Sequence, residues 1–152
     1  MITDYNSDYP DEGSSWFSAV DIEQKQIKWQ LNLPHSFIQP VLADDILYII
    51  TEPNAEPHVL NAVNAITGKI IWSQKLKNPT RASGPIVTNN AVIVPTTFDI
   101  EIYSRNTHQL MKEIMLEGAD VDIAVANNVL YYTENATDSG IPIAKLTAVK
   151  LN

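Results

Sequence analysis

One eleven-residue pattern occurs twice in this sequence, and its two copies are separated by a constant offset of 43 residues, from 19 to 62 and from 29 to 72. The first copy is Ala19–Trp29 (AVDIEQKQIKW) and the second copy is Ala62–Trp72 (AVNAITGKIIW). A period of roughly 20 to 50 residues is typical of solenoids, propellers and related arrays, in which each repeat packs against its neighbours. This repeat therefore constrains the possible folds more strongly than any other feature of the chain.

A second pattern recurs three times and predicts a β-hairpin in each repeat. Its copies are Pro40–Tyr48, Pro85–Ile93 and Ile123–Tyr131, and each contains two short apolar segments around an Asp-Asp or Asn-Asn pair. Asn and Asp tolerate the positive φ that the central residues of a tight hairpin turn require. Because the hairpins alternate with the eleven-residue pattern, the sequence predicts units of four antiparallel strands.

A series of strands follows from the apolar runs and from the Asn, Asp, Gly and Pro residues that separate them. We expect these strands at 15–21, 26–33, 37–43, 46–52, 58–64, 69–76, 83–88, 91–97, 99–104, 109–116, 120–126, 129–134 and 143–150. The segment 109–117 comes closest to a helical period. It occupies the position of 69–76 in the repeat, so we predict a strand there and keep a short helix as the alternative.

A four-stranded unit of about 40 residues has the length of one β-propeller blade. The predicted fold is therefore all-β. We expect a flexible acidic lead-in at 1–14 and a partial propeller at 15–152, divided into an outer half-blade at 15–33, blades at 37–76 and 83–116, and an incomplete blade at 120–150. Complete propellers have roughly four to eight blades, so about three blades form an arc that does not close by itself. The chain is then either a fragment of a longer propeller or a partner in a homodimer that associates through exposed strand edges.

The composition excludes several classes of function. A formal net charge of −8 repels nucleic acids and anionic membrane surfaces. The absence of cysteine rules out disulfides, thiolate metal sites and cysteine nucleophiles. The apolar runs are too short for a membrane span, and Met1–Pro10 lacks the basic and apolar regions of a signal peptide. We therefore expect a protein partner, or the remainder of a longer propeller, rather than a nucleic acid or a membrane.

The eleven-residue pattern resembles the repeat of the PQQ-type family, which is named after quinoprotein dehydrogenases and has the signature Ala-x-Asp-x-x-Thr-Gly-x-x-x-Trp. In the second copy these positions hold Ala62, Asn64, Thr67, Gly68 and Trp72. The first copy retains Ala19, Asp21 and Trp29. The third copy has Ile102, Ser104, Thr107, His108 and Lys112, so only the Thr is retained. The resemblance covers 16–152, and a fourth copy begins at Ala148.

This resemblance implies a place for each part of the repeat. The eleven-residue pattern would form the outer two strands of a blade, and the hairpin would form the inner two, nearest the central channel. The residues that would dock neighbouring blades are Ala19, Trp29, Ala62, Thr67, Gly68 and Trp72. Stacking of a ligand on Trp29 or Trp72 is the alternative. We expect looser docking in the third copy, because Lys112 cannot supply the buried area of a large apolar side chain, which stabilises by about 1.5–3 kcal/mol.

Few residues suggest chemistry. Asp120 and Asp122 are weak candidates for a cation site, since carboxylate oxygens suit calcium or magnesium, but a solvated acidic rim is the simpler interpretation. Asp99 and Glu101 alternate along a strand and are expected to face solvent. No two histidines have the spacing of metal ligands, and all three are expected in surface loops. They are His35, His58 and His108.

The quinoprotein enzymes of this family use a complete ring, a bound calcium and a catalytic Asp, and we can map none of these residues onto this chain. We therefore predict a non-enzymatic protein-binding or scaffolding module without a cofactor. One alternative is a fragment of a quinoprotein dehydrogenase whose active site lies outside this chain. The other is a small-molecule or sugar-sensing propeller. Members of the family often belong to the bacterial periplasm or cell envelope.

The longest predicted connections, 52–57 and 134–140, are the candidate interaction loops, because binding residues tend to lie on long loops of a rigid scaffold. Their candidate residues are Glu52, Asn54, Glu56, Asn135 and Asp138. Trp16 and Phe17 are expected to pack within the first strand, with an exposed anchor for a partner as the alternative.

Overall fold

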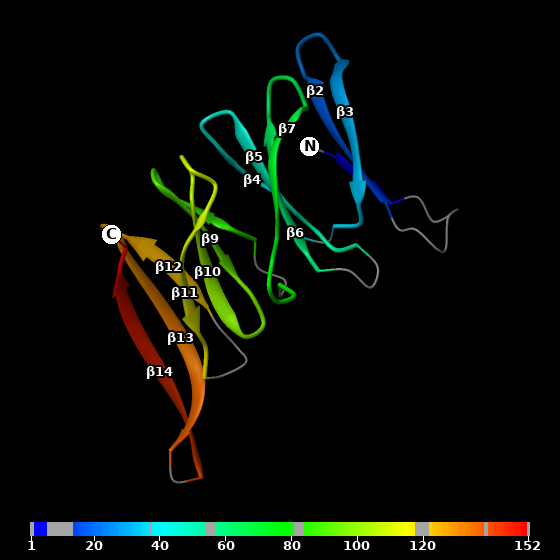
Figure 1. Cartoon of the computed structure of the whole chain (residues 1–152). Coiled ribbons are helices and arrows are strands. Elements are labelled where there is room, and N and C mark those ends of the chain that lie inside the picture. Colours follow the sequence, from blue (N-terminus) through cyan, green and yellow to red (C-terminus); the bar gives the residue numbers. More distant parts are fainter. Residues whose placement is uncertain are drawn as a thin grey trace. The chain divides into compact units, whose positions relative to one another are not determined.

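The computed structural model describes residues 2–5, 14–36, 38–53, 57–80, 84–117, 122–138 and 140–151. Strands are the only regular elements in these residues, and they form four antiparallel sheets (Figure 1). The predicted all-β fold of antiparallel, blade-like sheets is confirmed. The chain divides into Met1–Pro85 and Ile86–Asn152, which we call the first unit and the second unit.

The first unit contains two sheets. One has the strand order β1-β2-β3, with bounds Ile2–Tyr5, Ser14–Asp21 and Gln26–Pro34. The other has the order β4-β5-β6-β7, with bounds Val41–Ala43, Ile46–Thr51, Val59–Asn64 and Ile70–Lys75. Residues 2–5 pair with β2 as a strand, which differs from the flexible lead-in expected at 1–14. Residues 6–13 of that segment lie outside the described residues.

The second unit also contains two sheets. One has the order β11-β10-β9-β8, with β8 at Ile86–Val87, β9 at Ala91–Pro95, β10 at Asp99–Ser104 and β11 at Leu110–Met115. The other has the order β12-β13-β14, with bounds Ile123–Ala126, Val129–Asp138 and Ile141–Lys150. The segment 109–117 thus forms the predicted strand, and the alternative short helix is not formed.

The outer hairpins of three sheets share one register. The partners across each pair of strands are Ala19 and Trp29, Ala62 and Trp72, and Ile102 and Lys112. A register shift follows each of these pairs towards the turn, as a β-bulge produces. The repeat that is visible in the sequence is therefore a repeat of backbone geometry, and the third copy retains this geometry although its side chains differ.

The turn of each outer hairpin explains why the third copy folds like the others. Its first residue is Asp21, Asn64 or Ser104, and the side-chain oxygen accepts hydrogen bonds from the backbone N–H groups two and three residues later, at 2.8–3.2 Å. Such bonds stabilise a local turn. The turn then places a residue at positive φ, and these residues are Lys25, Gly68 and His108. The outer turn therefore requires a short side chain with an acceptor oxygen at its first residue, and Ser supplies this oxygen as Asp and Asn do.

The inner hairpins use two kinds of turn. Asp44 and Asp45 have positive φ, as do Asn127 and Asn128, as expected for tight hairpins. The Asn89–Asn90 turn does not, so the expectation of positive φ was wrong for this copy. There the backbone N–H of Ala91 donates to Thr88 Oγ1 at 3.0 Å, and the N–H of Thr88 donates to the Ala91 carbonyl at 2.9 Å. The Thr88 hydroxyl closes this turn without a left-handed residue.

Apolar side chains of the two sheets pack together within each unit. In the first unit the buried cluster consists of Phe17, Leu33, Leu47, Ile49 and Val63. In the second unit it consists of Ala91, Ile93, Ile100, Ile102, Leu130, Tyr132 and Leu151. Burial of such side chains is the main stabilising term for stacked sheets, since a sheet by itself leaves its apolar side chains exposed.

The prediction that Asp99 and Glu101 face solvent was wrong, because both residues are fully buried. The Thr96 hydroxyl donates a hydrogen bond to the Asp99 carboxylate, and the Tyr103 hydroxyl donates one to Glu101. Burial raises the pKa of Tyr103, and the hydrogen bond to Glu101 raises it further. Alternation along β10 showed that these residues share a face, but it could not show that this face is covered.

Candidate binding surfaces

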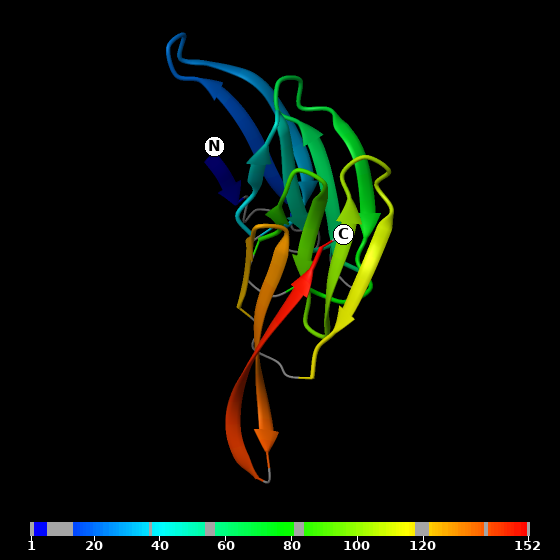
Figure 2. The same cartoon turned by 90° about the vertical axis from the view of Figure 1, so that its left-hand side faces the viewer.

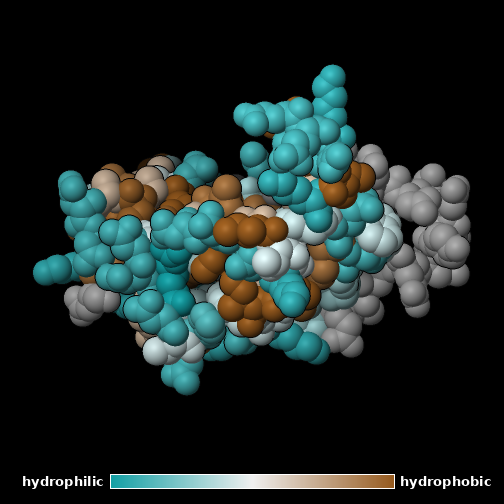
Figure 3. Space-filling view, turned by 90° about the horizontal axis from the view of Figure 1, so that it is seen from above, coloured by the Kyte–Doolittle hydropathy of each residue, from teal (hydrophilic) through white to brown (hydrophobic). Residues whose placement is uncertain are grey.

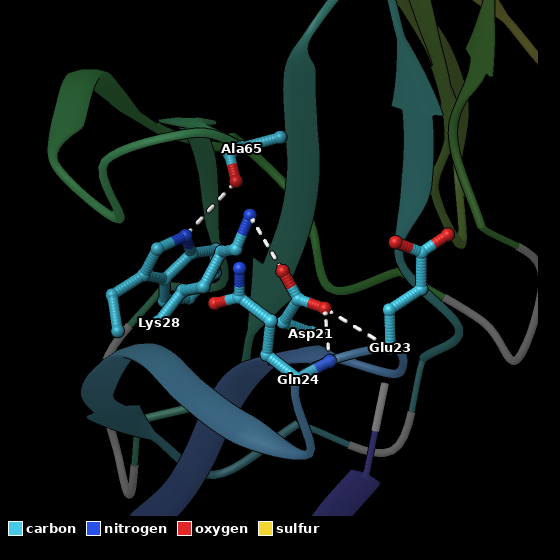
Figure 4. Close-up of polar contacts among 6 residues, drawn as sticks. Asp21, Glu23, Gln24, Lys28 and Ala65 are labelled. Carbon is cyan, nitrogen blue, oxygen red and sulfur yellow. Dashed lines mark hydrogen bonds and ion pairs between the residues drawn. The ribbon is translucent and has the colours of Figure 1, made fainter.

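Trp29 joins the two sheets of the first unit. Its indole Nε1 donates a hydrogen bond of 2.9 Å to the Ala65 carbonyl in the turn of the next outer hairpin (Figure 4). The ring also lies against Gly68, where an added Cβ atom would be only 2.6 Å from Cδ2 of the indole. Gly68 has a φ of 72°, a left-handed conformation that glycine adopts without strain. Both the backbone conformation and the indole contact therefore require glycine at this position.

The turn that precedes Trp29 is held by Asp21. Its carboxylate accepts hydrogen bonds from the backbone N–H groups of Gln24 and Glu23 and forms an ion pair of 3.1 Å with Lys28 (Figure 4). The Gln24 hydrogen bond and then the Lys28 ammonium lower the pKa of Asp21 below its ordinary value. The cluster lies at the surface, and it fixes the turn rather than forming a reactive site.

The other residues expected to dock blades lie at equivalent places in the fold. Ala62 is fully buried and pairs with the half-buried Trp72 across β6 and β7. The Thr67 hydroxyl donates to Asn64 Oδ1 at 3.0 Å within the outer turn. Ala19 pairs with Trp29. The docking role of the set as a whole stays a prediction, whereas the Trp29 contact is a direct observation.

The second unit has a pocket at the position that corresponds to the Trp29 contact. The pocket has a volume of about 160 Å³, and its lining includes Ile102, Met111, Lys112, Asn128, Lys150 and Leu151. Lys112 takes the place of the tryptophan in the register. The Leu151 N–H donates to the Asn128 carbonyl as the Ala65 N–H donates to Asp45, so Leu151 corresponds to Ala65. The Leu151 carbonyl accepts from the Asn128 side chain, which replaces the indole donor.

Of the two acidic residues considered for a cation site, one lies among the described residues. Asp122 is exposed, and Asp120 lies outside the described residues. Glu117 forms an ion pair of 3.3 Å with Lys145, and its backbone N–H donates to the buried Glu134 carboxylate at 2.6 Å. The hydrogen bond to Glu117 raises the pKa of Lys145. Among the described residues, no group of three or more His, Asp or Glu side chains could hold a metal ion.

The histidines lie at half-buried positions rather than on open loops. His58 Nδ1 accepts a hydrogen bond of 3.0 Å from the Thr80 backbone N–H, and this bond holds the segment that follows β7. The His35 carbonyl accepts from the Glu52 N–H at 2.7 Å. His108 fills the left-handed position of the third outer turn. Each of these observations is explained by a structural role.

The prediction of a loop at 134–140 was wrong, because most of this segment is strand. β13 continues to Asp138 and β14 begins at Ile141, so the connection is a tight turn that contains Gly140 at a φ of 82°. Asn135 is exposed, whereas Glu134 is buried. The Asp-Ser-Gly sequence is typical of a tight turn, and it could have predicted this hairpin. In the other predicted loop, Glu52 is half-buried, and Asn54 and Glu56 lie outside the described residues.

Large apolar residues are also exposed at the surface, where they alternate with polar ones (Figure 3). Several lie on the last sheet, and they are Tyr131, Ile141, Ile143 and Leu146. Tyr131 and Leu146 lie on one face of this sheet, and Ile141 and Ile143 lie on the other. Apolar residues scattered in this way are common on protein surfaces. In the part of the chain that the structure describes, no helix could span a membrane.

These sheets, with their repeated outer turn and Trp contact, define the chain as a PQQ-repeat β-propeller protein. The chain belongs to the family described as outer membrane protein assembly factor BamB, whose model matches residues 14–112. No curated protein matches the sequence.

Several solved structures share the fold. BamB from Moraxella catarrhalis is 15% identical with a TM-score of 0.62, and the match covers 91% of this chain and 40% of that one. KlAtg21 in complex with the coiled coil of AgAtg16 is 13% identical with a TM-score of 0.60, covering 97% and 51%. Kluyveromyces lactis Hsv2 is 14% identical with a TM-score of 0.55, covering 93% and 47%. The chain thus spans about half or less of these proteins' length, and the similarity shows the fold alone.

Proposed function

We propose that this chain is a non-enzymatic protein-binding module built on PQQ-like repeats, and that it serves as a scaffold for a partner protein. The observation that carries this proposal is the open edge of β14. This strand is ten residues long, pairs only with β13 among the described residues, and is exposed along most of its length. A row of unpaired backbone N–H and C=O groups is a template for an added strand.

The geometry of the last sheet supports an extended partner segment. β12 pairs only with Val129–Tyr132, so the remainder of β13 and β14 projects as a two-stranded ribbon (Figures 1 and 2). An isolated two-stranded ribbon is marginally stable in water, and a third strand would stabilise it. Ile141 and Ile143 are exposed on one face of the ribbon and offer apolar contacts.

Relatives support a binding role in general terms. The description of the family names an outer membrane protein assembly factor. The structure of KlAtg21 was solved in complex with a coiled coil. Binding residues tend to lie on loops that a rigid scaffold positions. A scaffolding role for this chain extends these likenesses, and it needs a direct test.

The test compares two substitutions at equally exposed positions. Ile141 and Met115 are each 65% exposed and lie on edge strands of the second unit. We expect Ile141→Lys to reduce recovery of the partner in affinity capture at least about tenfold, whereas Met115→Lys leaves it unchanged. Hydrogen exchange should show protection of β14 when the partner is bound. Equal recovery with both variants and no added protection would contradict the proposal.

A second candidate function is the binding of a small organic anion in the pocket of the second unit. Two lysines, Lys112 and Lys150, line a cavity that also has apolar walls, and such a mixture suits a ligand with a carboxylate and an apolar body. Thermal shift measurements with aromatic carboxylates test this candidate. A stabilisation that Lys112→Ala removes would favour it over the protein-binding module.

The quinoprotein alternative has its own measurement. Addition of PQQ and calcium with a redox dye should give no turnover by this chain. Turnover that depends on both additions would overturn the non-enzymatic proposal.

A further inference from the structure

We propose that His58 is a pH-sensitive tie, which holds the segment after β7 while the imidazole is neutral and releases this segment when the ring takes up a proton. The tie lies within the first unit, and it does not depend on the proposed partner protein. Its donors and acceptors are fixed by the chemistry of the groups in contact.

The Thr80 backbone determines which protonation state of the imidazole fits this site. The Thr80 N–H donates to His58 Nδ1 at 3.0 Å, and the Thr80 hydroxyl lies 3.0 Å from the same nitrogen. A backbone N–H can only donate, so Nδ1 must present a lone pair and the proton of the neutral ring is on Nε2. In a protonated imidazole both nitrogens are donors. Protonation therefore removes the acceptor and sets two N–H groups against each other.

Side chains also hold the segments that follow two other outer strands. After β3, the Ser36 backbone N–H donates to the Ser15 hydroxyl at 3.2 Å. After β11, the Glu117 backbone N–H donates to the Glu134 carboxylate at 2.6 Å. Of a hydroxyl, a carboxylate and an imidazole, only the imidazole ordinarily changes its protonation between about pH 5 and pH 8. Ties of one kind thus recur along the chain, and the tie at His58 is the one built to respond in this range.

Charged residues on the neighbouring strands do not alter this conclusion. Glu52 directly follows β5, Lys75 is the last residue of β7, and Lys77 comes soon after it. A carboxylate favours a protonated ring and an ammonium group disfavours it, so the two signs move the pH of protonation in opposite directions. In either case the protonated ring lacks the lone pair that the backbone donor needs. Glu56 and Arg81 lie outside the described residues.

The loss of this tie should stay local. The Leu76 backbone N–H donates to the His58 carbonyl at 2.8 Å, and this bond does not involve the ring. Leu76 is also buried, so the end of the sheet remains attached. The residues that acid should loosen are those after Leu76, up to Thr80. They belong to the connection between β7 and β8, and this connection becomes a segment whose order depends on pH.

Hydrogen exchange followed by NMR tests the tie in the unaltered chain. The protection factor of the Thr80 amide, which corrects for the intrinsic effect of pH on exchange, should fall about fivefold or more between about pH 7.5 and pH 5. The Ser36 amide is the internal reference, because its hydroxyl acceptor does not titrate, and should keep its protection. Equal losses at both amides would overturn the proposal, since acid would then be loosening the sheets rather than this tie.

Two variants separate His58 from the other histidines. His58→Gln supplies an acceptor oxygen that does not titrate, so Thr80 protection should become independent of pH. His108→Asn is the matched control, because it removes a titrating ring at a left-handed position that Asn tolerates. It should leave the pH dependence of Thr80 unchanged. Loss of this dependence in His108→Asn, or its persistence in His58→Gln, would contradict the assignment to His58.

The nitrogen chemical shifts of the imidazole give a check that needs no variant. At neutral pH the His58 ring should be the Nε2–H tautomer, because Nδ1 accepts from Thr80. Observation of the Nδ1–H tautomer overturns the proposal. Thr80 protection that is the same at both pH values in the unaltered chain overturns it as well.

Discussion

The two units solve the same docking problem with different side chains. In the first unit, the Trp29 indole fills the space beside the next outer turn, bonds to the Ala65 carbonyl and rests on Gly68. In the second unit, Lys112 occupies the equivalent register position, a pocket of about 160 Å³ is present, and Asn128 bonds to the Leu151 carbonyl. The difference shows that polar satisfaction and volume filling are separable. In the second unit the carbonyl keeps a hydrogen-bond donor, but the space beside the turn is not filled.

The largest effect on stability is expected from the contact of Trp29 with the next outer turn. Trp29→Ala should lower the free energy of unfolding by about 3 kcal/mol, because it removes a large packed ring and leaves the Ala65 carbonyl without its donor. Denaturant unfolding followed by far-UV circular dichroism measures this change. Trp29→Phe is the control, since it keeps a ring and loses the hydrogen bond, and should cost about 1 kcal/mol. A loss below about 1 kcal/mol for the alanine variant would show that the dock contributes little.

The next effect compares two glycines that share a left-handed backbone. Gly68→Ala should lower the free energy of unfolding by about 2 kcal/mol, because it adds left-handed strain and forces the indole away. Gly140→Ala should cost only about 1 kcal/mol, since its added Cβ meets no atom within 4 Å. Thermal unfolding of both variants measures the difference. Equal losses would mean that the Trp29 contact relaxes without cost.

A tryptophan introduced at the equivalent position of the second unit should stabilise that unit. Lys112→Trp is expected to raise the free energy of unfolding by about 1 kcal/mol, because it fills an existing cavity. All three tryptophans of the chain, at 16, 29 and 72, are in the first unit, so the new residue reports on the second unit by its own fluorescence. We expect a blue-shifted emission. An exposed emission with no stabilisation, as expected for the control Met115→Trp, would show that the pocket does not accept the ring.

The smallest effect is a pH dependence that belongs to the first unit. The pKa of Asp21 is lower in the folded chain than its ordinary value of 3.8, so its contribution to stability is complete above that value and is lost as the pH falls through the folded pKa. Asp21→Asn should remove this part of the acid dependence and keep the turn, as Asn64 does in the next repeat. The midpoint of thermal unfolding between pH 5 and pH 2 measures it. Identical acid dependence in both proteins would exclude a role for Asp21.

Much of the local structure was predictable because it depends on neighbours in the chain. The repeated Asp, Asn or Ser acceptor, the left-handed residue and the alternating apolar residues set the outer hairpins and their register. The family was predictable from the same residues, with Gly68 and Trp72 as the most specific signals. The Asn89–Asn90 turn was not, because its conformation depends on the hydroxyl of the preceding Thr88.

The candidate surfaces were less predictable. The 134–140 segment contains loop-forming residues, but pairing with Ile141–Lys145 makes it a ribbon. The exposure of Leu146 on the last sheet has no signal of its own, since Leu146 and Leu60 occupy the same place in the repeat and differ in burial.

The sequence alone determined most of the strands, the turns of the outer hairpins and the repeat family, because these depend on side-chain chemistry over a few neighbouring residues. Only the tertiary structure decided which faces are covered. It buried Asp99 and Glu101, left a pocket beside Lys112 and exposed Leu146. The physical reason is that alternation in a strand assigns a residue to one side of the sheet, whereas burial depends on whether another sheet packs against that side.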